Sequence, residues 1–247
     1  MLLRILNKFT DFSGTKGIRI LMYHQVLPKS IAYKNDFIVT VENLEKQFAY
    51  IKKNFETVFF KDLEASKQIK NKIILSFDDG YYNNIEYLVP LLEKYQLKAT
   101  IFIPTEFIQS NIKEGNKIYM DFDDLKSLDS HLIEIALHSH SHRNFSQLSI
   151  DESEGELLEN MKVLEQNAIP FTKVFAYPYG KFPKDKKLKK EFFAMLERIG
   201  IVSALRIGNN IEAYPFKNQY EVNRIDIKYG DSFKVFKWKL KFGKTKL

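Results

Sequence analysis

The sequence predicts an α/β protein in which parallel strands form one closed or nearly closed barrel with helices outside it. Short β-branched runs alternate with longer segments of helical periodicity along almost the whole chain, which is typical of a parallel sheet covered by helices. The 247 residues, 45% of them hydrophobic and 14% aromatic, supply enough apolar surface for one large domain. About seven strand–helix units fit a barrel better than an open sheet.

The expected strands are short runs rich in Ile, Val, Leu and Phe. The clearest is Ile73–Phe77, because a nearly uninterrupted apolar run fits a strand that is buried on both faces. The full set is Ile18–His24, Thr57–Phe60, Ile73–Phe77, Ala99–Pro104, Ile133–Leu137, Val174–Tyr177, Ile201–Leu205 and Val222–Ile227.

The expected helices carry apolar residues at three- and four-residue steps. Thr40 and Ser149 are suitable first residues for two of them, and Gly200 stands where a third should end. The full set is Thr40–Asn54, Tyr82–Tyr95, Phe122–Leu128, Ile150–Asn167, Asp185–Ile199 and Asp231–Leu240.

The chain contains no cysteine, and this excludes several classes of protein at once. A disulfide-stapled scaffold, a thiolate zinc finger, a cysteine nucleophile and an iron–sulfur cluster are all ruled out. Any metal must therefore be held by His, Asp or Glu. The net charge of +7 does not by itself indicate a nucleic-acid partner, because no motif that reads nucleic acid accompanies it, and we expect none.

Two Lys-rich stretches stand out, Lys184–Lys190 and Lys234–Phe242. In the second, Val235, Trp238 and Phe242 alternate with lysines, and such a basic amphipathic segment can lie on a membrane surface. We favour a simpler interpretation, in which a last helix packs its aromatic residues on the barrel and exposes its lysines.

The N-terminal residues 1–14 lack both a long apolar region and a small-residue cleavage site. The longest apolar runs elsewhere fall far short of the ~20 residues that a spanning helix needs. We therefore expect no signal peptide and no transmembrane helix, and a cytoplasmic location, with peripheral contact at the inner face of the membrane as an alternative. The sequence leaves the oligomeric state open.

Two adjacent carboxylates, Asp78 and Asp79, follow the strand Ile73–Phe77 and precede Gly80. In parallel α/β barrels the catalytic residues lie at the C-terminal ends of strands, which is where these two stand. Taken alone, however, Asp-Asp-Gly is equally consistent with a turn and a helix N-cap.

Three of the five histidines, His138, His140 and His142, follow the strand Ile133–Leu137. A continued strand would place all three on one face, whereas a turn or helical start would bring His138 and His142 together. Imidazole is a usual ligand of zinc and its neighbours. Three imidazoles at one strand end in a chain without cysteine favour a metal site over packing, and His131, in a polar loop, is expected at the surface.

Two histidines and one aspartate from two strand ends would leave positions on a metal open for water and substrate, as in catalytic sites. Neighbouring side chains of an extended strand cannot both point at one ion. One aspartate is therefore expected to bind the metal while the other accepts a proton from water. The pattern predicts metal-assisted hydrolysis.

Several segments together resemble the polysaccharide deacetylases, also called the NodB-homology domain or carbohydrate esterase family 4. They appear in the family's order across roughly 18–227, and they lead us to expect one domain over 1–247 with its core in that range. The matching segments are SFDDG at Ser76–Gly80, ATIFIP at Ala99–Pro104, HSHSH at His138–His142 and AYPYG at Ala176–Gly180.

The resemblance implies a distorted, NodB-like (β/α)₇ barrel that binds one divalent metal. It implies Asp79, His138 and His142 as the metal ligands and Asp78 as the general base. The backbone N–H of Tyr179 would help to hold the oxyanion. Pro178 and Gly180 would shape that loop, and His140 would support the site or line the substrate groove.

The chain departs from the family's pattern in two places. Ala176 stands where the RxPYG motif has an arginine, and Arg224 on a later strand is our candidate to supply that charge. No histidine follows His142, so the C-terminal Leu-x-His motif that usually supplies the general acid is absent. His24, at the end of the first strand in a YHxV element like that of exopolysaccharide-acting relatives, is the candidate acid. A packed strand-end histidine is an equal interpretation of that residue.

The function implied is removal of N-acetyl groups from an N-acetylglucosamine-type poly- or oligosaccharide. Zn²⁺ is the expected metal, with Co²⁺ or Ni²⁺ as alternatives. Two other functions remain open, an inactive carbohydrate-binding module and an O-acetyl esterase on a surface glycan. A glycosidase is disfavoured, because its two carboxylates must face each other ~5–9.5 Å apart, and an amidohydrolase barrel would need further histidines on later strands.

Overall fold

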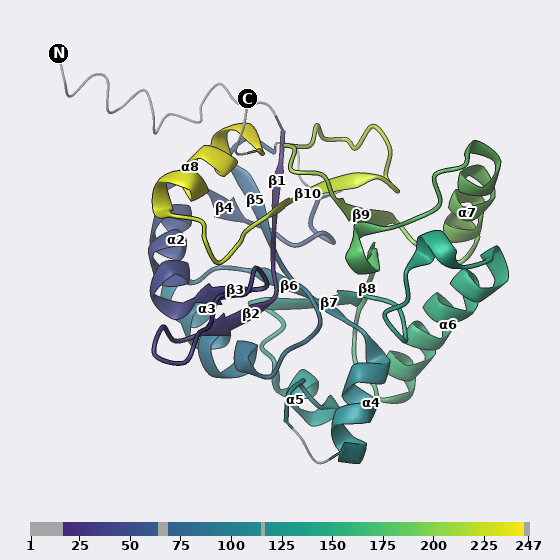
Figure 1. The fold of residues 1–247 in the computed structure, drawn as a ribbon, viewed down its shortest axis with the longest axis horizontal. Helices are drawn as coiled ribbons and strands as arrows, with labels where there is room; N and C mark the ends of the chain where they lie inside the picture. Colours follow the sequence, from purple (N-terminus) through teal and green to yellow (C-terminus); the bar gives the residue numbers. More distant parts are fainter. Residues whose placement is uncertain (1–16, 64–68, 115–116, 245–247) are drawn as a thin grey trace.

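The computed structural model describes residues 17–63, 69–114 and 117–244, and it has the predicted parallel barrel at its centre (Figure 1). Strand β1 pairs in parallel with both β5 and β10, which closes the sheet into a ring. The order around the ring is β1-β10-β9-β8-β7-β6-β5. The seven barrel strands are β1 (Arg19–Tyr23), β5 (Lys72–Phe77), β6 (Ala99–Ile103), β7 (Ile133–Leu137), β8 (Thr172–Ala176), β9 (Ser203–Ile207) and β10 (Val222–Asp226).

The helices lie outside the ring, with α6 and α7 against each other on one side and α2 beside α8 on another (Figure 1). The α-helices are α2 (Val41–Asn54), α3 (Val89–Tyr95), α4 (Thr105–Glu114), α5 (Phe122–Ser127), α6 (Ile150–Gln166), α7 (Lys186–Arg198) and α8 (Phe233–Phe242). Shorter elements are β2 (Gln25–Leu27), β3 (Ile38–Thr40), β4 (Glu56–Thr57), the π-helical turn η1 (Asn84–Leu88), and the 3₁₀ turns η2 (Phe145–Gln147) and η3 (Pro178–Gly180).

Each barrel strand overlaps a strand predicted from the sequence, and the (β/α)₇ fold class is confirmed. The prediction of a strand at Thr57–Phe60 is largely wrong. Only the two residues Glu56–Thr57 form a strand, which pairs with the first residues of β5. The chain then bends, and the N–H groups of Phe60 and Lys61 donate to the carboxylate of Glu134. The helix α4 and the strands β2 and β3 were not predicted, because they are short and partly polar.

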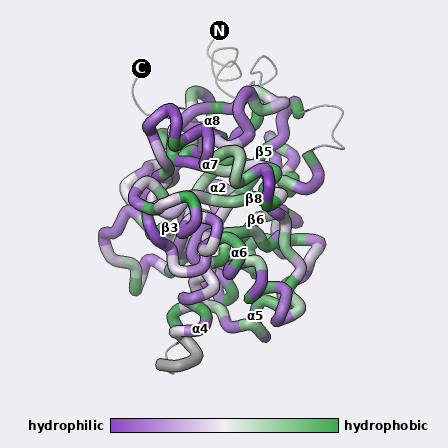
Figure 2. The backbone as a smooth tube through the Cα atoms, turned by 90° about the vertical axis from the view of Figure 1, so that its right-hand side faces the viewer, coloured by the Kyte–Doolittle hydropathy of each residue, from purple (hydrophilic) through white to green (hydrophobic). Residues whose placement is uncertain are grey.

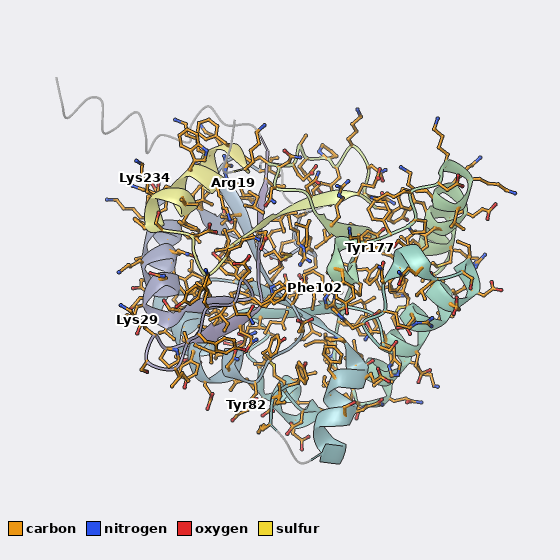
Figure 3. The ribbon with its side chains drawn as sticks, in the orientation of Figure 1. Arg19, Lys29, Tyr82, Phe102, Tyr177 and Lys234 are labelled. Atoms are coloured by element: carbon orange, nitrogen blue, oxygen red, sulfur yellow. The ribbon has the colours of Figure 1, made fainter. Side chains whose placement is uncertain are left out.

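Successive side chains along each barrel strand point to opposite faces of the sheet, and the apolar ones therefore form two separate cores. One fills the barrel and includes Ile20, Ile74, Phe102, Ala136 and Leu205, while the other lies between the strands and the helices. Figure 2 shows hydrophobic segments in the interior of the molecule and mostly hydrophilic segments on the outside. In Figure 3 the labelled Phe102 lies among the strands, whereas Lys29 and Lys234 lie at the outer edge.

The last helix packs on the molecule much as the sequence predicts. Phe236 and Leu240 are completely buried, and α8 lies beside α2. Lys239 is buried too, and its ammonium group donates to the Asp226 carbonyl and to the Asp231 carboxylate. Over the described ranges, no helix is both long and apolar enough to cross a membrane. The N-terminal segment 1–14 lies outside those ranges.

We expect Phe102→Ala to lower the free energy of unfolding by about 3–5 kcal/mol, because the ring is fully buried inside the barrel and its loss leaves a cavity. Urea denaturation measures this. The control is Phe233→Ala, whose ring is 39% exposed on α8 and should cost clearly less. Equal losses in the two variants would contradict the assignment of Phe102 to a tightly packed barrel interior.

Candidate active site

The candidate site is a cavity of about 440 Å³ at the C-terminal ends of the barrel strands. It collects eight of the ten residues that the sequence singled out, and leaves out His140 and Pro178. The lining residues are Met22, His24, Phe37, Asp78, Asp79, Tyr81, Phe107, Tyr119, His138, His142, Tyr177, Tyr179, Gly180, Ile207 and Arg224. A hollow of about 400 Å³ at the other end of the barrel surrounds Glu134, whose carboxylate already accepts four hydrogen bonds.

The two adjacent aspartates reach the cavity by different backbone conformations. Asp78 continues β5, since its N–H donates to the Tyr23 carbonyl at 2.9 Å. Asp79 leaves the strand with a φ of 71°, and Gly80 follows with a φ of 62°. This left-handed turn allows both carboxylates to enter one cavity, which an extended strand would not permit.

His138 stands directly after β7, and its ring is fixed by a backbone carbonyl. Its Nδ1 donates to the Ala176 carbonyl at 2.7 Å, and because a carbonyl only accepts, Nε2 carries no proton in the neutral ring. That Nε2 lies 3.5 Å from Oδ1 of Asp79. The chain then turns at Ser139, with a φ of 64°, instead of continuing as a strand.

The turn brings His142 back to the same carboxylate. Of the two arrangements expected from the sequence, this is the one in which a turn, and not a continued strand, brings His138 and His142 together. Nε2 of His142 lies 3.3 Å from Oδ1 of Asp79, and the rings of His142 and His138 are 4.8 Å apart. His140 points elsewhere: its Nδ1 is 2.9 Å from the hydroxyl of Thr105, and it does not line the cavity. His140 therefore ties the turn to the start of α4.

The three side chains Asp79, His138 and His142 fit a metal ion. Their ligand atoms all lie within 4.8 Å of one another. Ligands ~2.1 Å from a tetrahedral ion are about 3.4 Å apart, close to the two separations measured from Asp79. In addition, Oδ1 of Asp79 is buried and has no hydrogen-bond partner, which is costly for a carboxylate unless a cation satisfies it.

Asp78 forms a buried, bidentate ion pair with Arg224. The guanidinium donates to Oδ1 at 2.6 Å and to Oδ2 at 2.7 Å, and both side chains are at most 3% exposed. Burial alone would raise the pKa of Asp78, but the charges of Arg224 and His138 hold it well below its ordinary range. Arg224 also reaches the hydroxyl of Ser76 at 3.3 Å. Asp78 is therefore an anion at any ordinary pH.

The two imidazoles of the triad differ in their pKa values. Burial and the neighbouring His138 lower the pKa of His142 to about 4, which leaves its ring neutral near pH 7. Burial opposes charge on His138 as well, but the carboxylates of Asp78 and Asp79 raise its pKa above the ordinary value. A neutral imidazole is the form that binds metals, so His142 is ready to do so.

Three further predicted residues lie on the walls of the cavity. Nε2 of His24 is 3.9 Å from Oδ2 of Asp78, and its ring meets Phe37 edge-on at 4.7 Å. Tyr179 has a φ of 58°, is 60% exposed and places its ring 4.8 Å from that of His142. Gly180 follows with a φ of 64°, and a Cβ there would lie 3.0 Å from the backbone N of Ile207. Only glycine fits this approach.

An aromatic wall completes the cavity, and sequence reasoning did not find it. The rings of Tyr81 and Tyr119 are 5.1 Å apart and tilted by 34° to each other, and the ring of Phe107 lies 4.8 Å from that of Tyr119. Residues 81 and 119 are also joined by an isolated antiparallel bridge. These residues come from loops and from α4, where no periodicity marks them. The position of Tyr81 directly after Asp-Asp-Gly was the one available signal.

Known relatives share parts of this sequence. The provisionally named polysaccharide deacetylase YxkH of Bacillus subtilis is 27% identical over 172 residues, which cover 67% of this chain and 58% of that protein. The poly-beta-1,6-N-acetyl-D-glucosamine N-deacetylase of Staphylococcus aureus is 28% identical over 195 residues, covering 73% of this chain and 59% of that protein. The chain thus spans less than two thirds of the length of either relative.

Solved structures share the fold. The Streptococcus pyogenes deacetylase PplD, in complex with acetate, has a TM-score of 0.76 at 21% identity, and the match covers 93% of this chain and 100% of that one. IcaB from Ammonifex degensii has a TM-score of 0.67 at 19% identity, covering 85% of this chain and 91% of that one. The sequence profile described as polysaccharide deacetylase matches residues 65–194, more than half of the chain. Since that segment contains SFDDG, HSHSH and AYPYG, the chain belongs to the polysaccharide deacetylase family.

Proposed function

We propose that the protein is a metal-dependent hydrolase that removes N-acetyl groups from N-acetylglucosamine-type poly- or oligosaccharides. The observation that carries the proposal is that two neighbouring carboxylates, Asp78 and Asp79, have different surroundings suited to different chemical roles. Asp79 faces two imidazoles with an unsatisfied buried oxygen, while Asp78 is kept anionic by Arg224 at the edge of the same cavity. The first arrangement suits a metal ligand and the second suits a base.

Asp79, His138 and His142 would hold the metal, for which Zn²⁺ is the best match and Co²⁺ or Ni²⁺ are alternatives. When bound there, a divalent ion supplies Lewis-acid polarisation of an acyl oxygen and makes water more acidic. Asp78 accepts the proton of the attacking water, because it is anionic and lies beside the triad. The backbone N–H of Tyr179 stabilises the negative charge that develops on the acyl oxygen.

The leaving amine must receive a proton, and His24 is the group we assign to this step. It lines the cavity directly after β1, and its Nε2 lies 3.9 Å from Oδ2 of Asp78. His131 is exposed and His140 bonds to Thr105, so neither is placed to act. The aromatic wall supplies apolar faces on which a pyranose ring can stack. Similarity to the Staphylococcus aureus N-deacetylase supports an N-acetylated sugar as substrate.

We expect Asp79→Ala and His138→Ala to lose the metal and the activity together, because each removes a ligand of a three-residue site. Asp78→Asn should retain one equivalent of metal per chain. The measurement is metal content after dialysis against a limiting chelator, for protein loaded with zinc. Loss of metal from Asp78→Asn would contradict the separation of ligand and base.

Acetate release from N-acetylglucosamine oligomers tests the reaction itself. We expect release by zinc-loaded protein, none after metal removal, and a drop of about 10²–10⁴-fold in turnover for Asp78→Asn. His24→Ala should lower turnover while metal content and the unfolding curve stay unchanged. An unchanged rate in that variant would remove His24 from the mechanism, and release from O-acetylated but not N-acetylated sugars would make the protein an esterase.

Arg224→Met tests how the base is held. We expect the free energy of unfolding to fall by about 3–5 kcal/mol, since a buried carboxylate loses its partner. The pKa of Asp78 should rise towards and beyond its ordinary value. Asp78 must be ionised to act, so the fall in turnover as pH decreases should begin at higher pH than in the parent protein. A pH–rate profile that does not move would show that Arg224 has no influence on the base.

A further inference from the structure

The two imidazoles of the candidate metal site are held in different ways. The ring of His138 is fixed directly, because its Nδ1 donates to the Ala176 carbonyl at 2.7 Å. Nε2 of His142 faces Asp79, but in the part of the chain that the structure describes its Nδ1 has no hydrogen-bond partner. The position of the His142 ring therefore depends on the backbone of the turn that carries it.

The backbone of that turn is strained at both ends. Ser139 has a φ of 64° and His142 a φ of 56°, and residues other than glycine rarely adopt these left-handed conformations. Such conformations persist only where the surroundings fix them. One hydrogen bond lies inside the turn, from the backbone N–H of His142 to Oγ of Ser139 at 3.0 Å. The two residues between them, His140 and Ser141, are held from outside the turn.

The residue that holds both of them is Glu156, on α6. Its Oε2 accepts the backbone N–H of Ser141 at 2.8 Å, and its Oε1 accepts the hydroxyl of the same serine. Its backbone carbonyl accepts the N–H of His140 at 3.1 Å. Hydrogen bonds to a carboxylate are stronger than those between neutral groups. One helical residue thus fixes the middle of the turn with three hydrogen bonds.

The carboxylate of Glu156 serves the turn and not the helix. Among the described residues its oxygens bond only to Ser141, and it forms no ion pair with a lysine, arginine or histidine. The helix α6 is anchored by its own buried apolar side chains, such as Leu157 and Leu164. The helix therefore does not need this carboxylate for its packing on the barrel.

Space beside the turn would allow it to relax. Ser141 and His142 both line a hollow of about 770 Å³. Without the contacts to Glu156, Ser139 and His142 could leave their left-handed conformations, and the turn could move into this hollow. The imidazole of His142 would then no longer face Asp79, whose Oδ1 lies 3.3 Å from Nε2 in the structure.

We propose that Glu156 is a positioning residue that holds His142 in place for the metal, although it does not line the cavity itself. It acts through the backbone of the turn 139–142, by its hydrogen bonds to His140 and Ser141. The inference rests on the metal site of the proposed function, but not on the reaction or on the sugar. Loss of a group that supports a metal ligand usually lowers metal affinity by about 10–100-fold.

Zinc affinity, measured by competition with a chromophoric chelator, tests this role. We expect Glu156→Ala to bind zinc about 10–100-fold more weakly than the parent protein. Glu156→Gln should keep most of the affinity, because its amide can still accept the Ser141 N–H and donate to the Ser141 hydroxyl. The control is Glu159→Ala on the same helix, where Glu159 pairs with Lys162 at 3.0 Å, and its zinc affinity should equal that of the parent.

A double variant separates positioning of the ligand from a general loss of structure. His142→Ala removes the side chain through which Glu156 acts, so Glu156→Ala/His142→Ala should bind zinc as weakly as His142→Ala alone. Losses of affinity that add up in the double variant would overturn the proposal, and so would an unchanged affinity in Glu156→Ala. A fall in affinity that only follows a fall in the urea stability of the metal-free protein would overturn it too.

Acetate release is measured on the same proteins, so that the two proposals can fail separately. A parent protein that binds zinc but releases no acetate would contradict the proposed hydrolysis alone, and the zinc affinities would still decide the role of Glu156. A parent protein that binds neither zinc, cobalt nor nickel would overturn the metal site and the role of Glu156 together.

Discussion

The buried ion pair between Asp78 and Arg224 is the constraint on which the rest of the site depends. It joins β5 to β10, two strands that are separated in the ring by β1. Removing two charges from water is costly, and two short hydrogen bonds together with Ser76 offset that cost only while the barrel keeps its register. With Asp78 held in this way, its neighbour is free to turn towards the imidazoles, and the two carboxylates can take different chemical roles.

Local strain is concentrated at the same end of the barrel. Of the eight described non-glycine residues with positive φ, four are Asp79, Ser139, His142 and Tyr179. Each such residue costs on the order of 1–3 kcal/mol and persists only where its surroundings fix it. Here the surroundings are the ends of buried strands, so the barrel holds the turns that aim these side chains. This explains how short loops can place the polar atoms of Asp79, His138 and His142, which follow two different strands, within 4.8 Å of one another.

The sequence predicted the barrel strands because their apolar runs are local signals. It singled out Asp79, His138 and His142, which the structure brings together, because they lie in two short motifs. It could not predict how Asp78 and Asp79 both enter one cavity. That arrangement depends on the left-handed backbone conformation of Asp79, which the residue type alone does not specify. The regular spacing of HSHSH also suggested a role for His140 at the cavity, which the turn at Ser139 directs towards α4. The aromatic wall depends on loop packing, which has no periodic signature.

Closure of the barrel also brings a histidine from the first strand to the cavity, in a chain where no histidine follows His142. Strand β1 pairs with β5 on one side and with β10 on the other, so a residue at the end of β1 stands between Asp78 and the end of β10. His24 occupies that position although 54 residues separate it from Asp78 in the chain. In a closed ring of parallel strands the C-terminal ends of all strands meet at one cavity, so the proton donor that we propose can come from the first strand as readily as from the last.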